Sequence, residues 1–557
     1  MYTFALKSGA KINIYANSFN VENNGTIYFS FPVNTAVTTL GKKDKDEALS
    51  IPEIHNKDSY TEIIWHTKST LWEEKTYILE IHPDGFYYRI KVKGEGKIED
   101  IDYFINNNKP IRGTDFATEG FSIPEAFMTD FNGMCRKMDG DGNISYGYFQ
   151  VPSFVYPFFT KDMNTFIGIG VVAGEGQYKF NRFRYMYLED EDQCYFKLPL
   201  DGRTEVKGEW ESQGIWCDIG EGYKEVIGKY SSFLYNHGFC NIGNKEKPRW
   251  WQGPIYCGWG DQCEESARKF DDTEKAQDFA NQEFYEKLSD RLDELELKPT
   301  MLIIDDKWQK NHGSLEVDEA KWPDLRKFAD DQHKKGRRVI LWVRAWHNEG
   351  VDLDECMMYE RIPYAADPTN PKYQERMYKT VHKLLSSDEG CYNCDGFKLD
   401  FINNIFMHPA VRFYDNSLYG VEVFKKLITL FHDAAKKAKP DALINNSIVN
   451  PYFSEVTDHI RLNDYNRRFV SDEFRVMKYR ADIASASQPL TLIDTDSASY
   501  IYKDEAMDYI LNSYKLGVPD IYMLDPSVNF TFTDDEQKQI KAMWDAYSER
   551  IDKEYGI

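Results

Sequence analysis

Aspartates recur at the ends of short apolar runs in the second half of the chain, and tryptophans lie in or beside the same runs. The aspartates are Asp305, Asp306, Asp400, Asp464, Asp494 and Asp525, and the tryptophans are Trp259, Trp308, Trp342 and Trp346. A carboxyl group can serve as nucleophile, acid or base, and an indole offers a flat face for a sugar ring. Cleavage of a glycosidic bond needs such a set, because its oxocarbenium-like transition state requires a nearby anion and the leaving oxygen requires a proton donor.

These side chains can act together only if the elements that carry them bring them to one opening, since a lone aspartate at a strand end more often caps the next helix. Eight apolar, strand-like runs follow residue 250, at 254–259, 301–305, 339–343, 396–400, 442–445, 459–463, 490–494 and 520–524. Amphipathic stretches typical of helices separate most of them, including 274–294, 371–385, 421–438 and 534–551. This alternation predicts a (β/α)₈ barrel with catalytic side chains at the carboxyl ends of the strands.

The first part of the chain has a different sequence pattern. Residues 1–240 alternate aromatic and β-branched runs with turn signals, which predicts an all-β region, most simply a sandwich. The composition becomes polar near residues 238–248, where we place the boundary. The predicted fold is therefore multidomain, with an N-terminal β-sandwich over 1–240 and an α/β TIM barrel over 245–557. Its weakest unit is the fifth, because 447–457 is too short and aromatic for a full helix.

Composition excludes several classes of function. The chain has 68 basic and 91 acidic residues, a net charge of −23, and no basic stripe reverses that field. Nucleic acid and anionic membrane surfaces are therefore not expected partners. No apolar run approaches the length of a membrane span, and the N-terminus lacks a signal-peptide pattern. Nine scattered cysteines fit reduced thiols better than a disulfide framework, so we expect a cytoplasmic protein.

Five segments on consecutive barrel units resemble a known family. Residues 304–309, 315–328, 335–343, 367–371 and 395–401, the last containing Lys398-Leu399-Asp400, resemble in order the barrel of family 36 glycoside hydrolases. These are α-galactosidases of the melibiase type, in the clan shared with families 27 and 31. The resemblance covers residues 245–500, and the preceding β region lies where that family carries its N-terminal β-sandwich.

The resemblance implies a role for each matching residue. Asp400 corresponds to the catalytic nucleophile, and Lys398 to a ligand of the sugar O3 and O4 hydroxyls. Asp305 and Asp306 correspond to carboxylates that grip O4 and O6 of galactose. Trp308 and Trp342 correspond to stacking walls of the pocket. Two further candidates for substrate binding come from their positions at strand ends, Trp259 and Arg461.

The general acid/base is expected at the end of the sixth strand, where the family has a Trp-Thr-Ser-Asp-like tetrapeptide and this chain has Leu462-Asn463-Asp464. Asp464 is our choice. Its rival, Asp458, falls at the start of the same strand, on the wrong face of the barrel. If Asp400 and Asp464 form the pair, the reaction should retain anomeric configuration and the pKa of Asp464 should be raised.

Two segments depart from the family pattern. The Cys-Ser-Gly-Gly-Gly-like segment after the fifth strand is replaced by residues 444–453, so N-acetylgalactosamine or another sugar is an alternative to galactose. The acidic segment after the third strand is replaced by Arg344-Ala345-Trp346-His347. That change alters the charge at the pocket rim in a way that could favour an anionic substituent.

No metal or nucleotide cofactor is expected. Cys391 and Cys394 have metal-ligand spacing but lack a second pair of ligands, and no histidine grouping or phosphate-binding loop appears. The sequence thus predicts a retaining exo-α-glycosidase, in the first place an α-galactosidase acting on an oligosaccharide or glycoside, and the family resemblance suggests a homo-oligomer. The alternatives are an α-N-acetylgalactosaminidase, a glycosidase for a modified sugar, a raffinose-synthase-like transglycosylase, and a catalytically silent sugar-binding protein.

Overall fold

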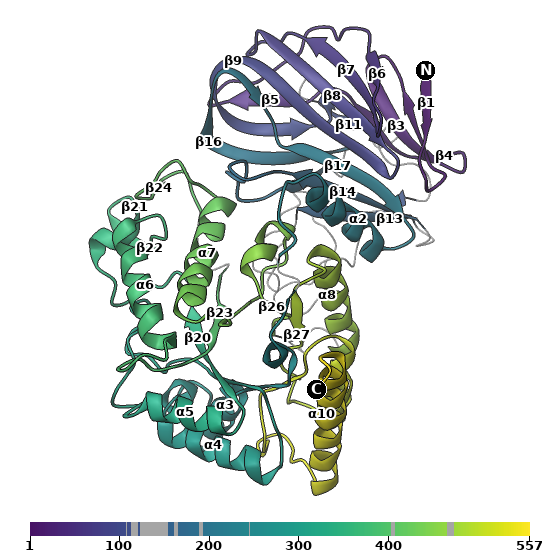
Figure 1. Ribbon diagram of the computed structural model, residues 1–557. Helices are drawn as coiled ribbons and strands as arrows, with labels where there is room; N and C mark the ends of the chain where they lie inside the picture. Colours follow the sequence, from purple (N-terminus) through teal and green to yellow (C-terminus); the bar gives the residue numbers. More distant parts are fainter. Residues whose placement is uncertain are drawn as a thin grey trace.

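The chain folds into a β domain followed by a barrel (Figure 1). The computed structural model describes residues 1–106, 109–112, 121–122, 154–160, 165–188, 193–243, 246–402, 407–464 and 473–557. Among the helices in these ranges, none combines the length and apolar character needed to cross a membrane.

Two antiparallel sheets form the β domain. The smaller one has the order β1-β2-β3-β4, with β1 (Tyr2–Ala5), β2 (Lys11–Ile14), β3 (Ser18–Asn23) and β4 (Thr26–Pro32). The larger one contains β5 (Ala36–Thr39), β6 (Glu53–Asn56), β7 (Thr61–Thr67), β8 (Glu74–His82), β9 (Gly85–Tyr103), β10 (Ile105–Asn106), β11 (Lys109–Arg112), β12 (Phe121–Ser122), β13 (Val155–Thr160), β14 (Phe166–Val172), β15 (Arg184–Leu188), β16 (Gln193–Glu211) and β17 (Gly214–Gly220).

Aromatic side chains hold these two sheets together. Phe19 and Phe31 of the smaller sheet stack at 5.1 Å between ring centroids and meet Phe86 of the larger sheet edge-on, at 5.2 and 5.6 Å. All three rings are buried. Inward-facing aromatics that alternate with polar residues are what two packed sheets require, and the predicted β-sandwich is confirmed.

Eight parallel strands form the barrel in the order β27-β26-β25-β23-β20-β19-β18-β28, and a parallel bridge from Asp494 to Val518 brings its two ends together. They are β18 (Ile255–Cys257), β19 (Met301–Ile304), β20 (Arg338–Arg344), β23 (Gly396–Asp400), β25 (Leu443–Asn446), β26 (His459–Arg461), β27 (Leu492–Asp494) and β28 (Asp520–Ile521). Each lies within or overlaps one of the eight predicted runs, so the predicted barrel is confirmed. We call the opening at the carboxyl ends of these strands the mouth.

Helices surround the barrel (Figure 1). They are α3 (Trp259–Phe270), α4 (Gln282–Glu294), α5 (Leu325–Lys334), α6 (Pro371–Leu385), α7 (Val421–Ala438), α8 (Glu473–Ser487), α9 (Lys503–Asn512) and α10 (Asp534–Glu554), with short 3₁₀ turns η2 (Arg249–Gln252), η3 (Ala276–Phe279), η4 (Leu353–Glu355), η5 (Pro451–Val456) and η6 (Ser513–Lys515). The fifth unit has only η5 in place of a helix, as predicted. A small sheet, β22-β21-β24, comprises β21 (Cys356–Tyr359), β22 (Ile362–Ala366) and β24 (Val411–Arg412).

A helix within the region expected to be all-β connects the two domains. α2 (Tyr223–Asn236) follows the last strand of the β domain and buries Val226, Tyr230 and Leu234. The Tyr230 hydroxyl donates to Val171 O on β14 (2.6 Å), whereas the Tyr223 hydroxyl donates to the Asp482 carboxylate on α8 (2.9 Å). α2 therefore packs against both domains.

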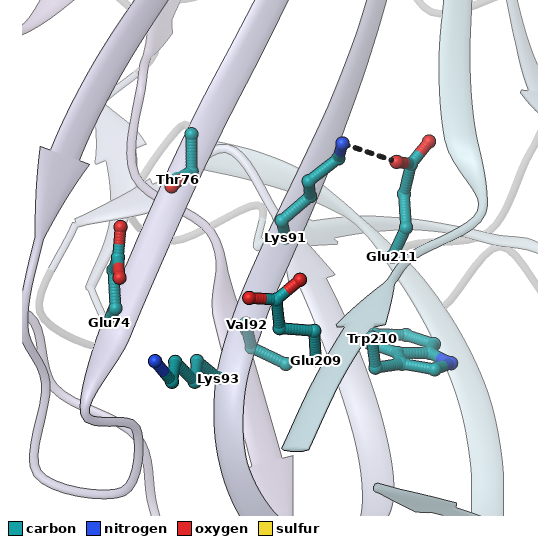
Figure 2. A pocket seen from close by; sticks show the side chains of 8 residues that line it. All are labelled: Glu74, Thr76, Lys91, Val92, Lys93, Glu209, Trp210 and Glu211. Carbon is teal, nitrogen blue, oxygen red and sulfur yellow. Dashed lines mark ion pairs between the residues drawn. The ribbon is translucent and has the colours of Figure 1, made fainter. Parts of the chain in front are cut away.

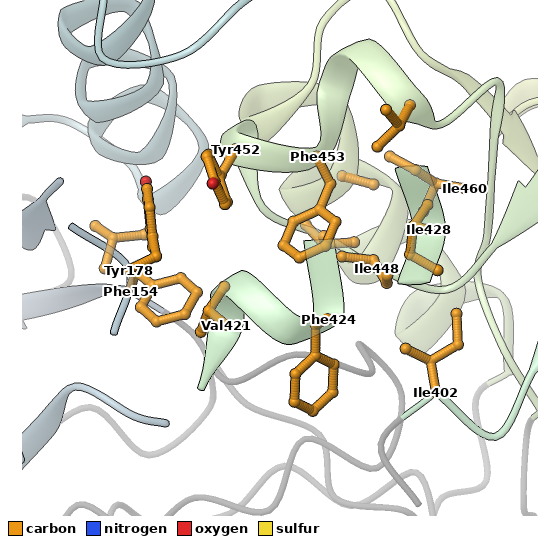
Figure 3. Packing of buried hydrophobic residues seen from close by; sticks show 14 of the residues in the cluster. Phe154, Tyr178, Ile402, Val421, Phe424, Ile428, Ile448, Tyr452, Phe453 and Ile460 are labelled. Atoms are coloured by element: carbon orange, nitrogen blue, oxygen red, sulfur yellow. The ribbon is translucent and has the colours of Figure 1, made fainter. Parts of the chain in front are cut away.

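Side chains from the two domains also meet directly at the start of α7 (Figure 3). The rings of Tyr178 and Tyr452 stack at 3.9 Å, and Val421 N donates to Phe180 O at 3.0 Å. At the N-cap of α7, Gly420 has φ +60° and ψ −133°, a conformation open essentially to glycine alone. A Cβ there would come within 2.2 Å of Phe180 O. The contact between the domains thus requires a glycine at this position.

We expect Gly420→Ala to lower the free energy of unfolding by about 3 kcal/mol or more, because the strained backbone and the clash with Phe180 add together. The matched control is Gly336→Ala. Gly336 also has a positive φ, +80°, but nothing lies within 4 Å of its added Cβ, so that variant should lose only about 1 kcal/mol. Urea unfolding of both variants measures the difference. Equal losses would show that the close approach to Phe180 contributes nothing.

Candidate active site

Asp400 lies at the mouth as the last residue of β23, where neighbouring described residues donate hydrogen bonds to it. Arg461 Nη2 donates to Asp400 Oδ1 (2.9 Å), Phe401 N donates to the same oxygen (2.8 Å), and Trp342 Nε1 donates to Oδ2 (3.3 Å). Burial raises the pKa of Asp400, but the charges of Arg461 and Lys398 outweigh it, so that the pKa lies below its usual value. Asp400 is therefore ionised and fixed in orientation, as a nucleophile must be.

Arg461 joins Asp400 to Asp464. This buried arginine, at the end of β26, contacts the Asp464 carboxylate through Nη1 (3.2 Å) and the Asp496 carboxylate through the same nitrogen (2.7 Å), in addition to Asp400. The planar guanidinium fixes the geometry of the carboxylates it bonds. The two predicted catalytic aspartates therefore lie on either side of one guanidinium.

Asp464 differs from Asp400 in its surroundings. Its side chain is 75% exposed, whereas that of Asp400 is 18% exposed. Desolvation of the carboxyl group and the nearby negative charge of Asp496 together raise the pKa of Asp464 to about 6. One carboxyl group is thus kept ionised and the other is protonated in mildly acidic solution, a division of roles typical of an acid and a nucleophile.

The backbone that carries Asp464 is anchored from α8. The buried Arg480 donates through Nη1 to the carbonyl oxygens of Leu462, Asn463 and Asp464 at 2.9, 2.7 and 3.2 Å. The rival candidate, Asp458, lies at the other end of the same strand, where its Oδ2 accepts from Ile444 N (2.8 Å) and Lys436 Nζ (2.8 Å). Asp458 thus ties a strand to a helix, as expected for the non-catalytic end of a barrel.

Lys398 and Asp305 form a buried ion pair beside Asp400. Lys398 Nζ donates to Asp305 Oδ2 (2.8 Å) and to the Tyr522 hydroxyl (3.1 Å). Burial lowers the pKa of Lys398, but Asp305 outweighs it and the pKa lies well above its usual value. Asp306 lies one layer further out, where its oxygens accept from Gln277 Nε2 (2.7 Å) and contact His312 Nε2 (2.8 Å). Lys398, Asp305 and Asp306 therefore all have partners within the protein. Their contacts with sugar hydroxyls stay a prediction.

The tryptophans divide between core and mouth. Trp308 is 0% exposed and donates through Nε1 to Trp342 O (2.8 Å), so it lies in the core beneath the site and cannot form a stacking wall in this conformation. Trp346 is likewise buried and donates to Ile402 O (2.7 Å). Trp342 is also buried, at 2% exposed, but its indole contacts Asp400 directly, and Trp259 is partly exposed at the start of α3. Trp342 and Trp259 thus remain candidates for contact with a sugar.

The prediction that all the strand-end aspartates share the mouth is wrong for Asp525. Its carboxylate binds Arg291 of α4 at 2.6 and 2.9 Å, on the outside of the barrel. Asp494 is buried inside, where it accepts from Asn445 Nδ2 (2.6 Å) and Asp496 N (2.9 Å). Asp496, which the sequence reasoning missed, reaches Arg461 instead. It follows a strand-end aspartate by two residues, and that repeat was the available signal.

Two groups of side chains could offer ligands to a metal ion among the described residues. His312, His347 and Glu349 each present one ligand atom within 4.8 Å of the others, and so do Asp352, Asp354 and Glu355. Lys307 Nζ lies 3.0 Å from Glu349 Oε2 and 3.4 Å from His312 Nδ1. Its ammonium already supplies the positive charge at the first group. Arg376 and Lys372 pair with the second group.

A pocket of about 370 Å³ on the β domain is a different kind of site (Figure 2). Lys91 faces Glu211 and Lys93 faces Glu209 across β9 and β16, with the first pair at 3.2 Å. Trp210 pairs with Val92, and because successive residues of a strand point to opposite faces, its ring points away from these charged side chains. Trp210 still contributes to the lining, but most of the pocket is formed by charged side chains on the face of a sheet.

No protein-family model matches the sequence, and a search of curated proteins found no match. Solved structures do resemble it. A family 31 sulfoquinovosidase from E. rectale aligns over 96% of this chain and 82% of its own at 11% identity, with a TM-score of 0.55. A family 36 α-galactosidase from Geobacillus stearothermophilus in complex with raffinose aligns over 99% and 86% at 10% identity, with a TM-score of 0.55. An α-galactosidase from Thermus thermophilus in complex with stachyose aligns over 89% and 99% at 13% identity, with a TM-score of 0.51. These likenesses show a shared fold of β-sandwich and barrel.

Proposed function

We propose that this protein is a retaining exo-α-glycosidase that hydrolyses terminal α-galactosides. The observation that carries the proposal is the pair of carboxyl groups with opposed ionisation, Asp400 and Asp464, on one guanidinium at the mouth of the barrel. Glycosidases with this pairing separate a nucleophile from a general acid. The fold shared with α-galactosidases supports the choice of sugar.

In this mechanism Asp400 attacks the anomeric carbon while the protonated Asp464 gives its proton to the leaving oxygen. The bond from the anomeric carbon to the leaving oxygen breaks as the bond to the Asp400 carboxylate forms. Asp464, now ionised, then takes a proton from water, which attacks the anomeric carbon and releases Asp400. Two inversions give net retention. Arg461 keeps Asp400 ionised before it attacks, and the ion pair of Lys398 with Asp305 lies beside it.

The test is hydrolysis of 4-nitrophenyl α-glycosides of galactose, N-acetylgalactosamine and glucose, followed by proton NMR. We expect the galactoside to be cleaved fastest and α-galactose to appear before mutarotation. Initial release of β-galactose would contradict the retaining mechanism. Faster cleavage of the N-acetylgalactosaminide would show that N-acetylgalactosamine is the substrate sugar. Formation of a new glycoside with an added acceptor sugar would identify a transglycosylase. Tight sugar binding with no cleavage in the panel would identify a binding protein.

A further inference from the structure

A cationic side chain stands beside Asp400 on the neighbouring strand. Arg344 is the last residue of β20 and pairs in register with Asp400 of β23. Paired residues on adjacent strands lie about 5 Å apart, and alternate residues share a face. Arg344 therefore projects on the same face as Trp342, whose indole donates to Asp400.

Arg344 differs from the other charged groups at this part of the mouth in having no ion pair among the described residues. Lys307 pairs with Glu349 (3.0 Å) and His312 with Asp306 (2.8 Å). The Arg344 guanidinium instead lies over the ring of Phe401, 5.0 Å from its centroid, and the side chain is only partly exposed. A partly desolvated guanidinium keeps its donors available and gains by meeting an anion.

The loops around Arg344 form one ordered unit. Glu349 O accepts from Gly313 N and Ser314 N, both at 3.1 Å, and the Glu349 carboxylate accepts from His312 N at 2.9 Å. The imidazoles of His312 and His347 lie 5.0 Å apart. His347 thus belongs to the same unit and follows Arg344 by three residues. Preorganised donors of this kind favour binding because little ordering remains to be done.

We propose that Arg344, with His347 beside it, binds an anionic substituent, a carboxylate or a sulfate, on the sugar that Asp400 attacks. This inference rests on the proposed function and narrows its substrate class to acidic derivatives of α-galactosides. The planar fork of arginine matches the paired oxygens of either group, and the register places Arg344 on the strand next to Asp400.

The experiment compares 4-nitrophenyl α-galactoside with the α-galacturonide and the 6-O-sulfo-α-galactoside. Its readout is the selectivity ratio, kcat/KM for each acidic substrate divided by kcat/KM for the neutral one. We expect a ratio above one for at least one acidic substrate in the wild type, and a fall of about thirtyfold in Arg344→Gln, the effect of losing one desolvated charge pair. Arg344→Lys should give an intermediate ratio. The acidic substrate with the larger ratio identifies whether the bound group is a carboxylate or a sulfate.

The matched control is Arg338→Gln, at the opposite end of the same strand, where Arg338 lies 3.5 Å from Asp395; its ratio should match the wild type within about twofold. A wild-type ratio below one for both acidic substrates, or an unchanged ratio in Arg344→Gln, would overturn the inference while leaving the glycosidase intact. Calorimetric binding of galacturonate, lost in Arg344→Gln, gives a readout without turnover. If no substrate is cleaved, the proposed function fails while this binding still reports on Arg344.

Discussion

Replacing Asp400 with asparagine should reduce kcat on an aryl α-galactoside by at least about a thousandfold, the order of loss seen when a nucleophile is removed from a catalytic unit. The amide has the size of the carboxylate and can still accept from Arg461, so the barrel should remain folded. It cannot, however, form the covalent glycosyl-enzyme. Steady-state kinetics measures the loss, and circular dichroism with thermal unfolding checks the fold.

Two further variants separate the nucleophile from a merely structural role. Asp433→Asn, at an exposed position whose ion pair among the described residues is with its neighbour His432, removes one carboxylate from the barrel domain and should turn over like the wild type. Asp400→Ala should regain activity with added azide. The azide enters the space left by the carboxylate, attacks the anomeric carbon and yields a glycosyl azide of inverted configuration. Turnover of Asp400→Asn at the wild-type rate would remove the mechanism proposed here.

The strands and several helices could be predicted because local chemistry alone determines them. α6 (Pro371–Leu385) and α7 (Val421–Ala438) begin and end where predicted. Asn370 caps α6 with its side chain ahead of a proline at the first helical position, and Gly420 precedes α7. The prediction of one helix over 274–294 was less accurate. A 3₁₀ turn occupies its first part, and α4 begins only at Gln282. Its N-cap is Asn281, whose side-chain oxygen accepts from Phe284 N.

The direction of a side chain at a strand end was harder to predict than its position. Asp525 follows β28 closely, yet the chain has already turned outward and the carboxylate meets Arg291. Trp308 matches the family motif, but its indole turns inward and donates to a carbonyl oxygen of the next strand. Arg461, expected to bind substrate, also bridges carboxylates, because Asp400 ends another strand and Asp496 lies two residues after β27. Pairings between strands depend on register and tilt, which no local pattern specifies.

α2 could have been predicted from its spacing. Val226, Tyr230, Phe233 and Leu234 recur at helical intervals, but the β-rich sequence around them favoured a strand interpretation. The helix packs against β strands on one side and α8 on the other. Its position links the β domain to the helix whose Arg480 holds the Asp464 backbone. A chain of contacts through α2 and α8 therefore connects the β domain to the backbone of the proposed acid/base.

Asp464→Ala should affect substrates according to their leaving groups. A 2,4-dinitrophenyl galactoside needs little protonation, so its cleavage to the glycosyl-enzyme should change by less than about tenfold, whereas a disaccharide, which requires the proton, should lose about 10²- to 10⁴-fold. Single-turnover kinetics measures the two. Equal losses for both substrates would indicate that Asp464 is not the acid and that the segment beside it has another role.

The pH dependence follows from the same pair of carboxyl groups. Asp464 must be protonated, and its pKa is about 6, so kcat/KM should fall as the pH rises through 6. Asp400 must be ionised, and its pKa lies below the usual value, so the acidic limb lies at a lower pH than the titration of an ordinary aspartate. Asp496→Asn removes a negative charge that raises the pKa of Asp464, so the upper limb should move to lower pH while the lower limb stays. An upper limb unmoved in Asp496→Asn would mean that another group donates the proton, because the Arg461 link makes Asp464 sensitive to this charge.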